Sequence, residues 1–173
     1  MKFLLVSLLV GAASCISSVF LQCDSQWGND LQGHYGGENI CKIGGGLSSI
    51  ASLLKKCDQG FYGFDVNPGS LNKWLKENNG YSNGDQIVWN KIDNIYGAIE
   101  YVTTTSNVDS IKYYIDRGDA ALLKVSARPH YVLSTSYASS HYNVLDPRDI
   151  YLSYQTYEVS EAVIFTYPSW CKS

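Results

Sequence analysis

Three polar residues that could take part in catalysis stand far apart in this chain: Gln22, His130 and Asp146. Hydrolysis by a cysteine nucleophile uses such residues together with the cysteine. The histidine is the base, the carboxylate orients the histidine, and an amide stabilises the oxyanion. The thiolate is favoured at a helix N-terminus, where free N–H groups lower the thiol pKa. The glycines at 44–46 precede an apolar helical pattern and would be that place, but no cysteine stands there.

Short motifs accompany these residues along the chain. They are Gln-x-Asp-x-x-Trp at 22–27, Lys-Ile-Gly-Gly-Gly-Leu-Ser-Ser at 42–49, Asn-Pro-Gly-Ser-Leu-Asn-Lys-Trp-Leu at 67–75, Gly-Tyr at 80–81 and Gly-Asp at 84–85. His130 then stands before an apolar run, and Asp146 precedes Pro147. In order and spacing, this set resembles the bacteriocin-processing-type cysteine peptidases (peptidase family thirty-nine and its relatives), a branch of the papain-like fold.

The resemblance covers nearly the whole chain after its first residues. The relatives carry roughly Lys-Val/Ile-Gly-Cys, followed by an apolar pair and Ser-Ser, and the stretch 42–49 fits this pattern without a gap. Gly45 therefore falls on the nucleophile position. The resemblance implies Gln22 as an oxyanion donor, His130 as the base and Asp146 on the adjacent strand as its partner, with Gly45 leaving room at the floor of a peptide-binding cleft.

Other roles for these residues remain open at this point. Gln22 could close a surface turn, His130 could be structural, and Asp146 before Pro147 could be a turn residue. Cys41 and Ser48 are poor substitutes for the nucleophile, since one stands four residues before Gly45 and the other most of a helical turn after it. The glycine run lacks the Gly-Lys-Ser/Thr ending of a phosphate loop. His34 and His141 are expected to be incidental.

The first residues have the features of a secretory signal. Lys2 precedes an apolar run at 3–13 that is too short to span a bilayer, and small residues follow. We expect a signal peptide at 1–18, with cleavage between 14 and 21, and a single domain at 19–173. A lipoprotein would use Cys15, but Ala12 stands where a large aliphatic residue is preferred. A secreted or vesicle-lumen protein is expected.

Removing Cys15 with the signal leaves Cys23, Cys41, Cys57 and Cys171, which suggests two disulfides. A helix over 46–56 would hold Cys41 and Cys57 well beyond the ~7 Å limit for bridged Cα atoms. Cys23 and Cys41 both lie close in sequence to the site that the resemblance implies, so we expect Cys23–Cys41 and Cys57–Cys171. A zinc site is not indicated, because no Cys-x-x-Cys pair is present.

Composition excludes some function classes. Charged residues make up 17% of the chain and the net charge is −3, without a basic run, which argues against a nucleic-acid partner. No cofactor and no stable membrane insertion are expected. The 14 tyrosines and 4 tryptophans indicate β-rich packing, or else a surface that stacks on sugars or peptides.

Local patterns predict an α+β fold with N-terminal helices packed on a C-terminal antiparallel sheet. The expected elements are an entry strand at 19–22, a loop at 24–39, helices at 46–56 and from Ser70 to Gly80, a helical turn at 85–92, a helix capped by Asp109, and strands at 98–104, 121–126, 130–137, 141–146 and 162–167. No repeat or linker is evident.

The sequence therefore favours a secreted, papain-like peptidase-fold protein that is catalytically inactive and keeps a cleft for a peptide or protein ligand. Two alternatives stay open. One is an active cysteine peptidase or amidase with a displaced nucleophile. The other is a structural extracellular protein that uses the fold for stability alone. The ligand and the oligomeric state are not indicated by the sequence.

Overall fold

A computed structural model describes residues 19–34, 37–58, 63–95, 97, 99–125, 130–148 and 153–171. The expected signal peptide at 1–18, with its cleavage site and Cys15, lies outside the described residues, as do Ala98 and Ser126 at the ends of two expected strands.

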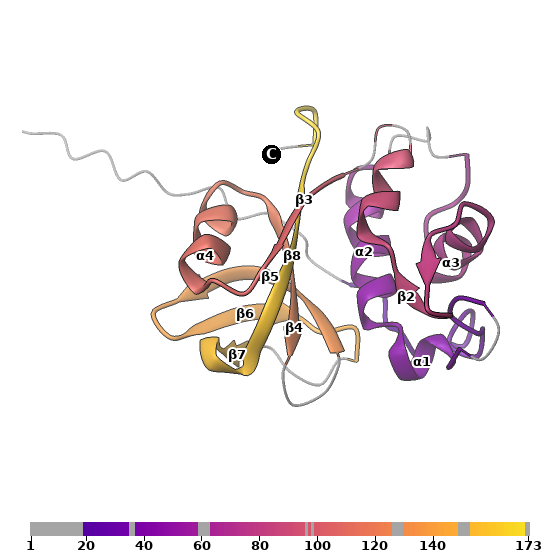
Figure 1. Cartoon of the computed structure of the whole chain (residues 1–173), viewed down its shortest axis with the longest axis horizontal. Coiled ribbons are helices and arrows are strands. Elements are labelled where there is room, and N and C mark those ends of the chain that lie inside the picture. The colour runs from indigo at the N-terminus through magenta and orange to yellow at the C-terminus, as the bar shows by residue number, and fades with distance from the viewer. Residues whose placement is uncertain are drawn as a thin grey trace, which may run out of the picture.

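The fold has the α+β class that the sequence predicts, with a helical half and a sheet half (Figure 1). The helical half contains α1 (Ile40–Ile43), α2 (Gly45–Lys56), α3 (Pro68–Glu77), a short hairpin of β1 (Tyr81–Ser82) and β2 (Gln86–Ile87), and the 3-10 helix η1 (Trp89–Asn94). The sheet half contains β3 (Glu100–Thr105), α4 (Val108–Asp116), β4 (Ala120–Val125), β5 (His130–Ala138), β6 (His141–Leu145), β7 (Ser153–Gln155), the 3-10 helix η2 (Thr156–Glu158) and β8 (Val159–Thr166).

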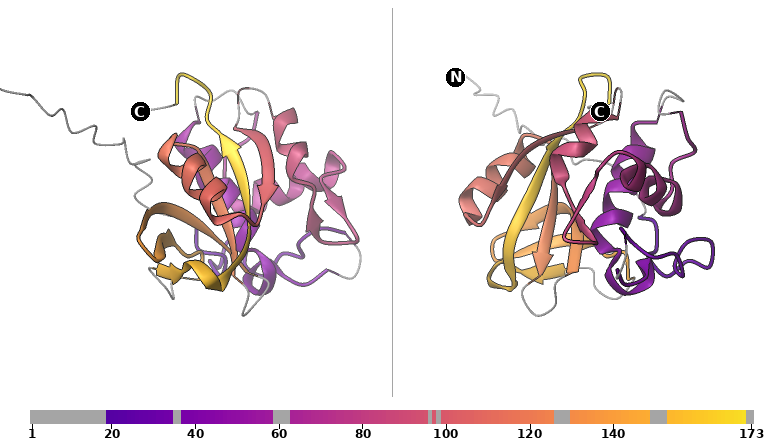
Figure 2. Two further views of the ribbon diagram at one scale, coloured as in Figure 1. Left: turned by 60° about the vertical axis from the view of Figure 1, so that its left-hand side comes forward. Right: turned by 45° about the vertical axis from the view of Figure 1, so that its right-hand side comes forward.

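The six strands form one antiparallel sheet in the order β3-β8-β4-β5-β6-β7. Helices cover both faces, with α2 on one and α4 on the other (Figure 2). Side chains alternate between the two faces, as the pleat requires. On β4, Leu122 packs in the core with α2, whereas Leu123 packs in the core with Ile111 of α4.

The helix starts differ from the expected ones because asparagines cap them. Asn67, not Ser70, caps α3: its backbone is extended, its side chain accepts from the Ser70 backbone N–H, and the Ser70 hydroxyl accepts from the Asn67 N–H. Asn107, not Asp109, caps α4, since its side chain accepts from the Ser110 N–H.

One further expectation about the elements was wrong. The segment 19–22 is not a strand, because the N–H of Phe20 bonds the Ser52 hydroxyl and that of Gln22 bonds the Pro147 carbonyl, so no ladder forms. The helical turn expected at 85–92 is present as η1, but it is preceded by β2 and extends to Asn94. Sequence reasoning missed the β1–β2 hairpin, whose turn contains Asn83 and Gly84 at positive φ.

Both predicted disulfides are confirmed. Cys23 pairs with Cys41 and Cys57 pairs with Cys171. The first ties the entry segment to α1, and the second fastens the C-terminal end to the end of α2. Within the described ranges, no helix combines the length and apolar character needed to cross a membrane.

The disulfides close loops of very different length, which gives a test of the fold. The sequence separation is 114 for Cys57–Cys171 and 18 for Cys23–Cys41, so the loop-entropy relation makes the first about 1.6 kcal/mol more stabilising. We expect the Cys57→Ala/Cys171→Ala protein to lose that much more free energy of unfolding than the Cys23→Ala/Cys41→Ala protein. Urea denaturation of both variants measures the difference. Equal losses would contradict this.

Candidate functional site

The sheet and the helical half meet where β5 begins and α2 begins. His130 is the first residue of β5, and Asp146 directly follows β6, its antiparallel neighbour. The start of one strand and the end of the other lie at the same end of the pair, so the two side chains meet. The distance from His130 Nε2 to Asp146 Oδ1 is 2.7 Å, and both residues are buried.

Asp146 accepts several hydrogen bonds. Besides His130, the Arg148 backbone N–H donates to Oδ1 at 2.8 Å, and the Tyr154 hydroxyl of β7 donates to Oδ2 at 3.1 Å. Burial by itself would raise the pKa of the Asp146 carboxyl group. The donated hydrogen bonds, led by that from His130, outweigh burial and hold this pKa below its ordinary value, so the carboxylate is the stable form.

The other nitrogen of the imidazole faces the first residue of α2. A Cβ atom built on Gly45 would lie 2.6 Å from His130 Nδ1, 2.7 Å from His130 Cε1 and 2.7 Å from the Tyr131 carbonyl oxygen. Real Cβ atoms do not make such short contacts. The expectation of room above Gly45 was therefore wrong, because the histidine ring and a strand carbonyl fill the space that a side chain would need.

Gln22 lies beside the same region but is fully buried. Its backbone N–H bonds the carbonyl of Pro147, and its side-chain Nε2 donates to the carbonyl of Cys41. Its Oε1 has no hydrogen-bond partner among the described residues. The assignment of the amide is chemically sound, because the reversed orientation would set two oxygens against each other. The side-chain NH₂ group of Gln22 therefore already donates a hydrogen bond within the protein.

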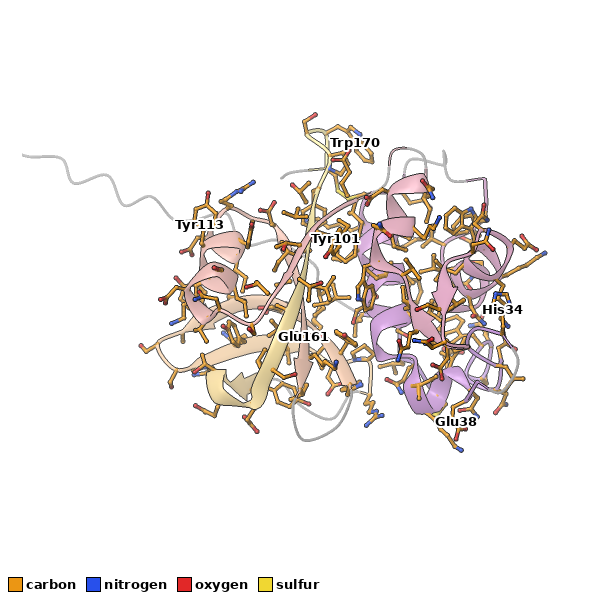
Figure 3. The ribbon with its side chains drawn as sticks, in the orientation of Figure 1. His34, Glu38, Tyr101, Tyr113, Glu161 and Trp170 are labelled. Carbon is orange, nitrogen blue, oxygen red and sulfur yellow. A yellow bond between two sulfur atoms is a disulfide. The ribbon has the colours of Figure 1, made fainter. Side chains whose placement is uncertain are left out.

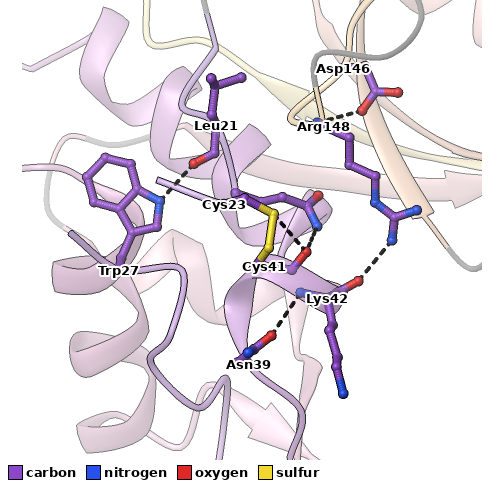
Figure 4. The surroundings of a disulfide bond; sticks show 9 residues. Leu21, Cys23, Trp27, Asn39, Cys41, Lys42, Asp146 and Arg148 are labelled. Atoms are coloured by element: carbon purple, nitrogen blue, oxygen red, sulfur yellow. Dashed lines mark hydrogen bonds between the residues drawn. A yellow bond between two sulfur atoms is a disulfide. The ribbon is translucent and has the colours of Figure 1, made fainter. Parts of the chain in front are cut away.

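The Cys23–Cys41 disulfide, next in sequence to Gln22, links the entry segment to α1 (Figure 4). Arg148 extends the contact, since its Nη2 donates to the Lys42 carbonyl at 2.9 Å while its backbone N–H holds Asp146. The loop after β6 is thereby fixed both to α1 and to the Asp146 carboxylate.

A cleft of about 470 Å³ opens beside Gly46. Its lining residues come from both halves of the molecule and are Gln32, Ile43, Gly46, Asp85, Gln86, Ile87, Trp89, Lys124, Tyr131 and Glu161. A Cβ on Gly46 would lie 2.9 Å from Cη2 of Trp89, so the glycine permits the indole ring to form part of the floor. On the sheet side, Glu161 accepts from Tyr131 at 2.8 Å and from Lys124 at 3.2 Å.

The remaining sequence candidates lie outside this arrangement. Cys41 is disulfide-bonded, and Ser48 is fully buried in α2, so neither presents an accessible nucleophile. His34 stacks edge-on against Tyr81 in the helical half, apart from the sheet (Figure 3), and His141 begins β6 opposite Ala138. No group of residues suited to a metal ion occurs in the described part of the chain.

Sequence reasoning found His130, Asp146 and Gln22 but missed Arg148 and Tyr154. The Asp-Pro-Arg stretch at 146–148 was a usable signal, because an Asp side chain often bonds the backbone N–H two residues later. Tyr154 belongs to a three-residue strand with no comparable signal. Comparisons with protein-family models, with curated proteins and with solved structures found no match to the chain.

The lowered pKa of Asp146 predicts a pH-dependent stability. The folded-state pKa lies below the unfolded value of about 3.9, so the carboxylate stabilises the fold above that pH, and this is lost as the pH falls through the folded-state pKa. Asp146→Asn should cost about 2 kcal/mol at pH 7, and less and less below pH 4. Urea denaturation from pH 7 to pH 2 measures this, with the exposed Asp109→Asn as control. A cost of Asp146→Asn that stays constant down to pH 2 would contradict this prediction.

The crowding at Gly45 predicts that alanine is not tolerated there without loss. Alanine is favoured over glycine in helices by about 1 kcal/mol, but the new Cβ must displace His130 or the Tyr131 carbonyl, so Gly45→Ala should destabilise the protein by about 1–3 kcal/mol. Adding His130→Ala removes two of the three close atoms. A double-mutant cycle by urea denaturation should show that the cost of Gly45→Ala then falls, whereas additive effects would mean that the ring does not crowd this position.

Proposed function

We propose that this chain is a secreted papain-like pseudopeptidase that binds a peptide or protein segment without cleaving it. The observation that carries the proposal is the imidazole of His130, which bonds Asp146 through Nε2 and turns Nδ1 toward Gly45. A base and its orienting carboxylate thus point at the start of a helix, where a thiol nucleophile is expected and glycine stands instead.

The cleft supports a binding function. It lies next to Gly46, one residue beyond the nucleophile position, and its volume of about 470 Å³ is in the range of ligand-binding clefts. Aromatic rings, amides and charged groups converge on it from both halves of the molecule. This mixture suits a peptide, which offers apolar side chains together with a polar backbone.

The two disulfides support an oxidising compartment such as the extracellular space or a vesicle lumen. The four cysteines of the described residues are all paired, so none of them is a free thiol. This favours an inactive protein over a peptidase with a displaced nucleophile. The papain-like assignment rests on the order of the motifs together with the geometry of His130, Asp146 and α2.

Restoring a thiol tests whether Gly45 occupies a nucleophile position. In Gly45→Cys the new Cβ must displace the His130 ring or the Tyr131 carbonyl, as in Gly45→Ala, and the sulfur then stands at the start of α2 beside the displaced ring. The thiol pKa should therefore fall below the free value of about 8.5. The pH dependence of alkylation by iodoacetamide reports that pKa. We expect a midpoint at least about one unit below 8.5. We also expect that the wild type cleaves no peptide.

A matched control separates activation from simple access. Gly45→Cys with His130→Gln keeps much of the side-chain volume but removes the base, so its alkylation midpoint should return to about 8.5. Identical midpoints in the two variants would mean that His130 does not activate this position, and the pseudopeptidase proposal would fail. Peptide cleavage by the wild type that is lost in Cys41→Ala would instead establish a displaced nucleophile.

A further inference from the structure

The lining of the 470 Å³ cleft offers hydrogen-bond acceptors in excess. Gln32 is buried, its Nε2 donates to the Asp85 carbonyl, and its Oε1, also buried, has no partner among the described residues. The Asp85 side chain is only partly buried and takes part in none of the ion pairs found in the described part of the chain. A ligand group rich in donors would complement the Asp85 carboxylate.

The charges that line the cleft also favour a ligand with hydrogen-bond donors, because they favour a cation. Asp85 and Glu161 bring two carboxylates, and Lys124 brings one ammonium group. Lys124 is already paired with Glu161, at 3.2 Å, and Tyr131 donates to the same oxygen. The ammonium is therefore neutralised within the protein, whereas no cation of the described residues pairs with Asp85 on the opposite wall. The uncompensated charge of the cleft is negative.

The aromatic rings favour a flat cation over a compact one. Trp89 and Tyr131 meet edge to face in the cleft, with their ring centroids 5.2 Å apart. A guanidinium group stacks on such rings and carries five N–H donors and no acceptor. An ammonium group offers three donors and holds its hydration shell more tightly. The acceptors and the rings together thus suit arginine better than lysine.

We propose that the cleft recognises an arginine side chain of the bound peptide, with Asp85 as the residue that pairs with its guanidinium. The inference rests on the proposed function, because it names the chemistry of the segment that the same cleft would bind. Glu161 and Lys124 form the opposite wall and keep their own ion pair.

Blocked tripeptides test this with the full-length protein. Acetyl-Gly-Arg-Gly-amide is compared by titration calorimetry with the same peptide carrying lysine, citrulline or glutamate in the centre. Citrulline keeps the shape of arginine and loses its charge. We expect arginine to bind about tenfold more tightly than citrulline and glutamate to bind most weakly. Raising the salt concentration should narrow these differences.

Asp85→Asn is the decisive variant, and Asp109→Asn, an exposed change on α4, is its matched control. We expect Asp85→Asn to bind the arginine and citrulline peptides equally and Asp109→Asn to keep the tenfold preference. A preference that survives in Asp85→Asn would overturn the assignment to Asp85. Equal binding of all four peptides by the wild type would overturn the inference and leave the peptide-binding cleft, whereas no binding of any peptide would overturn both.

Discussion

The close approach of the sheet to the first residue of α2 is the constraint on which this site depends. The ring of His130 and the carbonyl of Tyr131 occupy the space where a Cβ of residue 45 would lie. Only glycine permits this approach, although it is a poor residue for a helix. Burial of Leu47 and Ile50 against the sheet residue Leu133 holds the helix in place. The two halves can therefore pack this closely only because residue 45 has no side chain.

The His130–Asp146 pair has a structural role at the same place. Asp146 receives hydrogen bonds from β5, from β7 and from the backbone of Arg148, whose guanidinium reaches the Lys42 carbonyl in α1. Removing one partner from a buried and well-satisfied network of this kind destabilises the fold. The network therefore connects β5, β7 and the residues that follow β6 to α1 in the helical half. This structural role does not require catalysis.

The sequence predicts the parts of this molecule that depend on local pattern or on the order of motifs. Apolar spacing located α2, alternation located most of the sheet, and the length of α2 excluded a Cys41–Cys57 bond. The caps at Asn67 and Asn107 were missed because neighbouring serine and aspartate have similar preferences. The filled space above Gly45 could not be predicted, since the sequence shows only a missing side chain and not the position of a ring from residue 130.

The charge of the cleft also could not be predicted from the sequence. Asp85 and Lys124 stand far apart in the chain, and nothing in their local sequence says which carboxylate each cation meets. The pairing follows from the register of β4 with β8, which sets Lys124 directly opposite Glu161. Asp85 is excluded from that pair because it lies in the turn between β1 and β2, on the helical side of the cleft. A one-residue shift of β8 would point Glu161 to the other face and leave Lys124 free to neutralise the cleft. The negative character of the cleft is therefore a property of strand register, not of composition.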